Sequence, residues 1–213
     1  MSLHEIIDEA RTELDAKSRL HELAQNSGRE IVRASKQTVL YVHQGDLKKA
    51  GQRLQLAKRR IHKVVKLSGR NPELVYTGSF ILACQEYAEA QLLLSYVKDG
   101  KLLSWTDIGV QPLPYLLGLG DLIGELRRSV VDLLRNGRVE KAEGRLRFME
   151  EVYMEVFAID NPLALSGGLR RKLDVARKLI EITRSEVSVE VRRRALEESI
   201  EGLQKALAER KPC

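Results

Sequence analysis

Apolar residues recur every three or four positions along almost the whole chain, and no segment alternates strictly between apolar and polar residues. A period near 3.6 is typical of amphipathic α-helices, whereas strict alternation is typical of half-buried β-strands. We therefore expect an all-α fold of about seven helices. Because the connections between these helices are short, consecutive helices should be antiparallel neighbours in one bundle.

Residues that cap or end helices mark the expected boundaries. The predicted helices cover residues 3–42, 47–67, 73–98, 112–135, 139–157, 169–183 and 187–209. Gly28 lies inside the first helix and either bends it or weakens it. Asn71 is expected to cap the third helix, with Pro72 at its first position. Residues 104–107 should form a short connector, and residues 160–168 the longest loop.

The composition supports one helical domain. Of the 213 residues 43% are hydrophobic and only 5% aromatic, and this length suffices to bury one sizeable core. No repeat, Pro-rich tract or Gly/Ser linker interrupts the chain, so we expect a single domain over residues 1–213. Cys84 and Cys213 make no disulfide framework, which fits a reducing cytoplasm. No stretch approaches the roughly 20 apolar residues of a membrane span, so we expect a soluble protein.

Two pairs of acidic residues stand out because their surroundings are apolar. Glu86 and Glu89 are three positions apart within the apolar run of residues 80–94, and Asp121 and Glu125 are four apart on the next long helix. Either spacing places both carboxylates on one face of a helix. Since a connection of some fifteen residues joins the two helices, we expect them to be antiparallel neighbours.

If the two acidic faces meet, four carboxylates converge and repel one another unless a cation lies between them. All-oxygen sites favour hard divalent cations, here Mg²⁺ or Mn²⁺. Such a cation can activate water and stabilise charge on a phosphoryl oxygen, so the pattern predicts a hydrolytic site for a phosphodiester.

Other interpretations remain open from the residues alone. Acidic pairs on helices are usually solvated or paired, in this chain with Arg127 or Arg128 as available partners. A di-iron carboxylate bundle would need Glu-x-x-His motifs, and none of the histidines lies on the two acidic helices. These histidines are His4, His21, His43 and His62.

The sequence around the acidic pairs resembles the translin family, in the branch of translin-associated factor X. Residues 85–90 (QEYAEA) and 114–127 (PYLLGLGDLIGELR) are similar to the corresponding helices of that branch, and residues 169–177 are similar to a late helix shared by the family. The resemblance spans nearly the whole chain and is strongest over residues 78–128. Since the chain is short, without the branch's long N-terminal extension or its insertion between helices three and four, it is similar to a compact prokaryotic, archaeal-type member.

The resemblance implies a seven-helix subunit that assembles into hollow, usually octameric shells binding single-stranded RNA or DNA. It also implies that Glu86, Glu89, Asp121 and Glu125 form a Mg²⁺-dependent endoribonuclease site facing the interior. Plain translin subunits lack the full set. A non-catalytic nucleic-acid-binding oligomer is therefore the main alternative, and a structural scaffold the third. We expect a homo-oligomer, although the residues leave a mixed shell open.

Basic clusters on the first two helices are the expected contacts to nucleic acid. The chain carries a net charge of +6, and lysine and arginine neutralise phosphates without reading the base sequence. The predicted binding residues are Arg29, Arg33, Lys36, Lys58, Arg59, Arg60, His62 and Lys63. Each cluster taken singly is equally consistent with a solvated helix face. The run of residues 192–194 (RRR) is instead expected to pair within its own helix with Glu197, Glu198 and Glu201.

Overall fold

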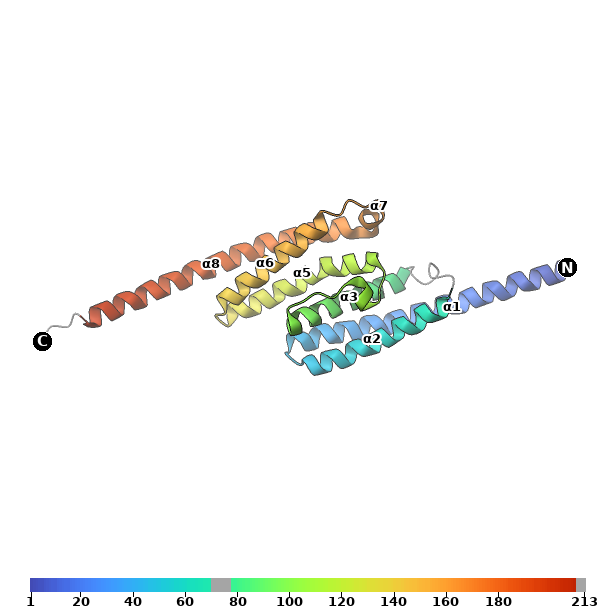
Figure 1. Ribbon diagram of the computed structural model, residues 1–213, viewed down its shortest axis with the longest axis horizontal. Helices are drawn as coiled ribbons and strands as arrows, with labels where there is room; N and C mark the ends of the chain where they lie inside the picture. Colours follow the sequence, from blue (N-terminus) through green and yellow to red (C-terminus); the bar gives the residue numbers. More distant parts are fainter. Residues whose placement is uncertain (70–77, 210–213) are drawn as a thin grey trace. The chain divides into compact units, whose positions relative to one another are not determined.

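The computed structural model describes residues 1–69 and 78–209, which are almost entirely helical and include no strand (Figure 1). The predicted all-α fold is thus confirmed. The chain divides into two compact units, residues 1–122 and the residues from 123 onward, and each is described by itself. The single domain expected over residues 1–213 stays a prediction.

The first unit contains α1 (Leu3–His43), α2 (Leu47–Ser68), α3 (Gly78–Asp99), the short α4 (Trp105–Ile108) and the first part of α5 (Pro112–Arg135). α1 packs against both α2 and α3. The apolar positions spaced by three and four form its core, as the sequence predicts. Its largest fully buried side chains are those of Ile31, Ile61, Phe80, Tyr87, Leu92, Leu93, Ile108 and Leu122.

Local signals in the sequence account for the turns of this unit. Gly45 adopts a φ of 77°, which suits glycine, and the Asp46 side chain accepts a hydrogen bond from the backbone N–H of Lys49 at 3.0 Å to cap α2. α1 continues without a break through Gly28. This glycine is buried against α3, where an added Cβ would lie 3.4 Å from the carbonyl oxygen of Ser79. Gly28 therefore serves helix packing.

The connection from α3 to α5 is anchored at both ends. Ser104 and Asp107 form a reciprocal capping box at the start of α4, and the Tyr115 hydroxyl donates to the carbonyl of Leu103 at 2.9 Å. These contacts fix the start of α5. The predicted cap at Asn71 and Pro72 lies outside the described residues.

The second unit contains the rest of α5, α6 (Val139–Phe157), the single turn α7 (Pro162–Ala164), a kinked segment (Leu165–Leu169) and α8 (Arg170–Glu209). The loop predicted over residues 160–168 is therefore confirmed in part: residues 162–164 form a helical turn instead, whereas the backbone of Gly168 is non-helical, with a φ of 98°. The Asn161 side chain accepts hydrogen bonds from the backbone N–H groups of Leu163 and Ala164, at 3.0 and 3.3 Å, and so starts a helical turn at Pro162.

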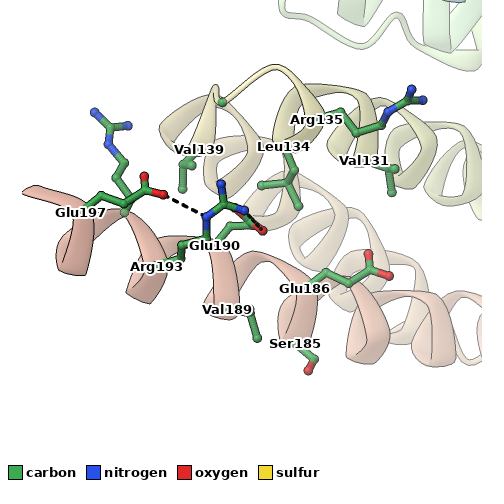
Figure 2. Close-up of a pocket in the computed structure, with 12 residues that line it drawn as sticks. Val131, Leu134, Arg135, Val139, Ser185, Glu186, Val189, Glu190, Arg193 and Glu197 are labelled. Atoms are coloured by element: carbon green, nitrogen blue, oxygen red, sulfur yellow. Dashed lines mark hydrogen bonds and ion pairs between the residues drawn. The ribbon is translucent and has the colours of Figure 1, made fainter.

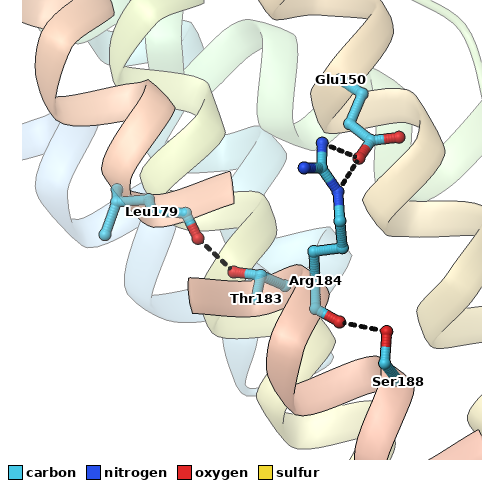
Figure 3. A network of polar contacts seen from close by, with 5 residues as sticks. All are labelled: Glu150, Leu179, Thr183, Arg184 and Ser188. Atoms are coloured by element: carbon cyan, nitrogen blue, oxygen red, sulfur yellow. Dashed lines mark hydrogen bonds and ion pairs between the residues drawn. The ribbon is translucent and has the colours of Figure 1, made fainter. Parts of the chain in front are cut away.

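The two last helices predicted over residues 169–183 and 187–209 are one continuous helix, α8. Figure 3 shows the polar contacts of its middle segment. The hydroxyls of Thr183 and Ser188 donate to backbone carbonyls one turn earlier, at 2.6 and 2.7 Å. The Arg184 guanidinium pairs with Glu150 of α6 at 2.7 Å. The hydroxyl side chains of this segment are therefore compatible with a continuous α8, which contains no proline.

Both long terminal helices extend beyond the parts of them that are buried. No residue of α1 before Ala24 is buried, and none of α8 after Val187 among those whose side chains are described. None of the helices in the described part of the chain is long and apolar enough to cross a membrane.

Candidate functional site

The first acidic pair emerges from an otherwise buried helix. Glu86 and Glu89 of α3 are half-buried, whereas Gln85, Tyr87 and Ala88 beside them are buried. Burial of the intervening residues fixes the face from which both carboxylates project. The sequence-predicted arrangement of this pair on one helix face is therefore present in the first unit.

Helix α5 meets α3 at this acidic segment, through Gly118. A Cβ added to Gly118 would lie 3.0 Å from the backbone nitrogen of Glu89, 3.1 Å from the carbonyl oxygen of Gln85 and 3.1 Å from the Cβ of Ala88. At these separations an added side chain would force its neighbours to shift by a few tenths of an ångström, and two of the three neighbouring atoms belong to the backbone. Glycine at position 118 thus allows the two helix backbones to approach directly beneath the acidic pair.

One turn beyond Gly118, a side-chain hydrogen bond links Asp121 to the same segment. The Gln85 Nε2 group donates to Asp121 Oδ2 at 2.6 Å, and Gln85 is only 6% exposed. Asp121 is accordingly held beside the residue that precedes Glu86. Glu125 follows four residues later on α5 and shares a helix face with Asp121.

The donor set is all oxygen, but it is not a closed cage. Within the described ranges, no group of three or more His, Cys, Asp or Glu side chains is arranged to hold a metal ion. Mg²⁺ in enzymes is usually held by one or two carboxylates, with water and substrate phosphates completing its shell. The carboxylates of Glu86, Glu89 and Asp121 fit such an open site in residue type, and the convergence of four carboxylates stays a prediction.

The predicted basic residues of α1 are all on the surface. Arg29, Arg33 and Lys36 are exposed, and the Arg29 guanidinium donates to the side chain of Asn26 at 2.6 Å. This hydrogen bond leaves the positive charge of Arg29 intact. The face defined by the three residues is therefore cationic and open to solvent.

The predicted basic residues of α2 fall into two groups. Arg59, His62 and Lys63 are exposed and Lys58 is half-buried. Arg60 is also exposed but forms an ion pair with Glu30 of α1, with Arg60 Nε and Glu30 Oε2 2.6 Å apart. Arg60 therefore contributes less positive charge to a ligand than its neighbour Arg59 does.

A groove of about 600 Å³ on the first unit was missed from the sequence. Tyr41, Lys49, Arg53 and Arg59 line it together with neutral side chains, and no acidic residue is part of the lining. Lys49 Nζ lies 5.8 Å from the ring centroid of Tyr41 and 2.8 Å from Asp46 Oδ2. Lys49 and Arg53 are one helical turn apart, which is the signal that could have identified them. The groove offers cations and an aromatic ring to a ligand.

A groove of about 820 Å³ in the second unit has a different character. In Figure 2, Arg193 lies between two acidic side chains, 3.6 Å from Glu190 and 3.1 Å from Glu197. Arg194 pairs with Glu198 in the same way. The predicted pairing within the helix is confirmed for both arginines. No sequence-predicted site residue lines this groove, and its charges compensate one another.

Cys84 is buried in α3, and burial raises the pKa of its thiol to about 12. The thiol is therefore protonated at neutral pH and should be inert in the folded protein. In a Cys213→Ser variant at pH 8, we expect iodoacetamide to label Cys84 only after denaturant is added. Mass spectrometry of native and unfolded samples measures this, and rapid labelling of native protein would contradict the burial.

Comparison with known proteins gives consistent matches. The model of the Translin family matches residues 3–186. The Methanocaldococcus jannaschii protein MJ0175 is 30% identical over 183 residues, covering 85% of this chain and 81% of that protein. A translin-associated protein X homolog of Schizosaccharomyces pombe is 27% identical over 162 residues, covering 69% of this chain and 70% of that protein.

Solved structures agree with these relatives. The structure of AfC3PO in complex with duplex RNA matches this chain with a TM-score of 0.79 at 30% sequence identity. The match covers 89% of this chain and 98% of the AfC3PO chain. The structure of apo-NeC3PO matches with a TM-score of 0.76 at 22% sequence identity, and the match covers 86% of this chain and 96% of the NeC3PO chain. It shows that the two proteins share a fold.

Proposed function

Because the chain belongs to the translin family, we propose that it is an oligomeric RNA-binding protein that cleaves single-stranded RNA with the help of Mg²⁺ or Mn²⁺. One observation carries the catalytic part of this proposal. The hydrogen bond from Gln85 to Asp121 brings an acidic residue of α5 beside the acidic segment of α3.

Nucleic-acid binding is supported by the family and by the surface of the first unit. The related AfC3PO forms a complex with duplex RNA, and the groove of Tyr41, Lys49, Arg53 and Arg59 carries cations without a lining acid. Cationic side chains bind the phosphate backbone, and an aromatic ring can stack on an unpaired base. We assign single-stranded RNA as the substrate, with single-stranded DNA as a second ligand.

In the proposed site, the divalent cation would be held by one or two carboxylates from Glu86, Glu89 and Asp121, with water and RNA phosphate oxygens completing its shell. Glu125, the fourth predicted ligand, lies on the next turn of α5. A bound divalent cation supplies a Lewis acid for a phosphoryl oxygen and an activated water. The carboxylates orient this centre, and one of them accepts a proton from the attacking water. Water adds to the phosphorus atom, the bond from phosphorus to the leaving ribose oxygen breaks, and that oxygen takes up a proton, so that one phosphodiester gives a phosphate end and a hydroxyl end.

The test is a cleavage assay on purified protein. We expect single-stranded RNA to be cut in Mg²⁺ or Mn²⁺ and to remain intact in EDTA. A site with only one or two carboxylate ligands would use phosphate oxygens of the RNA to complete the coordination shell of the cation. Mn²⁺ should therefore bind more tightly when RNA is present. RNA that stays intact with either cation, while binding persists, would favour the non-catalytic alternative.

The adjacent Arg59 and Arg60 offer a matched test of the binding surface. Arg59→Gln should weaken RNA binding and lower the salt dependence of the logarithm of affinity by about 0.7 for one lost phosphate contact. Arg60→Gln removes a charge that Glu30 already compensates and should change binding less. Fluorescence anisotropy over a series of KCl concentrations measures both, and equal effects would contradict this assignment.

Assembly into a homo-oligomer is supported by the exposed end of α8. Leu196, Ile200, Leu203 and Leu207 recur at spacings of three and four, and each is at least 45% exposed. An apolar stripe of this kind is typical of a surface that another subunit covers. The octameric shell stays a proposal, which light scattering on the purified protein tests.

A further inference from the structure

Gln85 is a buried amide in a helix segment whose other buried residues are almost all apolar. Its neighbours Ala83, Cys84, Tyr87 and Ala88 are at most 1% exposed. A buried amide costs free energy unless its polar atoms are hydrogen-bonded. The Nε2 group of Gln85 meets this need through Asp121 Oδ2, 36 positions away in the sequence and on another helix.

The acceptor is a carboxylate, and this makes the pair informative. A hydrogen bond to a carboxylate is stronger than one between neutral groups, and it restricts the orientations that the acid can adopt. The contact also lies close to the acidic pair, since Gln85 is one helical turn before Glu89 and shares its helix face. Gly118 allows the two helix backbones to approach closely one turn away, which brings Asp121 within reach of the Gln85 amide.

We propose that Gln85 is a positioning residue that orients the Asp121 carboxylate for a divalent cation. This inference rests on the proposed function, because it assigns a role toward the cation of that site. Groups that hydrogen-bond to metal ligands hold those ligands in the orientation that the metal requires, and their removal typically lowers metal affinity or activity about 10–100-fold. Gln85 itself does not touch the cation or the RNA.

Titration with Mn²⁺, followed by electron paramagnetic resonance of the free ion, tests the proposal without relying on activity. Gln85→Met keeps the length of the side chain but removes the donor, and it should weaken Mn²⁺ binding about 10–100-fold. Gln85→Asn keeps an amide but shortens its reach and should also weaken binding. Gln91→Met, elsewhere on α3, is the matched control and should bind Mn²⁺ like the wild type.

An exchange of the two partners separates positioning from a purely structural role. In the double variant Gln85→Glu with Asp121→Asn, an amide can again donate to a carboxylate across the helices. We therefore expect its thermal stability to recover relative to Gln85→Met while Mn²⁺ binding stays weak, because the proposed ligand at position 121 is now a neutral amide. A purely structural role predicts that Gln85→Met lowers stability but leaves Mn²⁺ affinity unchanged.

The outcomes distinguish this inference from the proposed function. A wild-type protein that binds no Mn²⁺, with or without RNA, would overturn both. A wild type that binds Mn²⁺ while Gln85→Met and Gln85→Asn bind it equally well would overturn the role of Gln85 alone. Tighter Mn²⁺ binding by Gln85→Met would show that the Gln85 amide competes with the cation for Asp121. This result would also overturn the positioning role.

Discussion

Glu89→Gln and Asp121→Asn should each lower the rate of Mg²⁺-dependent RNA cleavage by at least about 100-fold. Each change replaces a charged oxygen ligand with a neutral amide of the same shape, and removal of one group that stabilises developing charge typically costs a factor of about 10²–10³. The fold should survive, because the amide oxygen of an Asn at position 121 can still accept the hydrogen bond from Gln85. Single-turnover cleavage of a labelled RNA measures the effect.

The matched control is Glu22→Gln, which neutralises an exposed carboxylate on α1. This variant should cut RNA at the wild-type rate, and all three variants should assemble and bind RNA as the wild type does. Cleavage that continues in both Glu89→Gln and Asp121→Asn would remove these acids from the catalytic site. The family relationship and the basic groove would then support binding alone.

Gly118→Ala should lower the free energy of unfolding by about 1–3 kcal/mol, the usual cost of forcing an extra group into a packed core. The added Cβ would lie only 3.0 Å from the Glu89 nitrogen and 3.1 Å from the Gln85 carbonyl oxygen. Backbone atoms cannot rotate away, so α3 and α5 would have to separate. Urea unfolding followed by circular dichroism measures the loss.

Gly51→Ala in α2 provides the control, because an added Cβ there meets nothing within 4 Å. Alanine favours helix over glycine, so Gly51→Ala should stabilise the protein by about 0.5–1 kcal/mol. Both substitutions gain the same helix propensity and differ in packing alone. If Gly118→Ala were as stabilising as Gly51→Ala, the close approach of α3 and α5 would be wrong.

Periodicity and capping predicted most of the fold because these signals are local. The bounds of α2, α5 and α6 agree with the predicted ranges within two residues. The wrong predictions lie at polar residues, which occur both in loops and within or at the start of helices. The predicted break between residues 183 and 187 does not occur, and the hydroxyls of Thr183 and Ser188 beside it bond to carbonyls of the same helix. Asn161 and Pro162 suggested a loop, yet they begin a helical turn.

The candidate site was only partly predictable, since its decisive contacts join residues far apart in the sequence. Spacing identified the two acidic pairs, and the structure adds the contact that links Asp121 to α3. Nothing in the spacing indicated that Gln85 would supply it. Likewise, the ion pair of Arg60 with Glu30 joins two helices, so the sequence could not show which basic residues were already compensated.

A crystal of the protein grown with Mn²⁺ and a short RNA that resists cleavage gives the most direct test of the acidic site. The account predicts an anomalous peak with Asp121 and at least one of Glu86 and Glu89 as direct ligands, and with a phosphate oxygen of the RNA in the same shell. Bound RNA with these carboxylates directed away from one another, and no Mn²⁺ beside them, would contradict it.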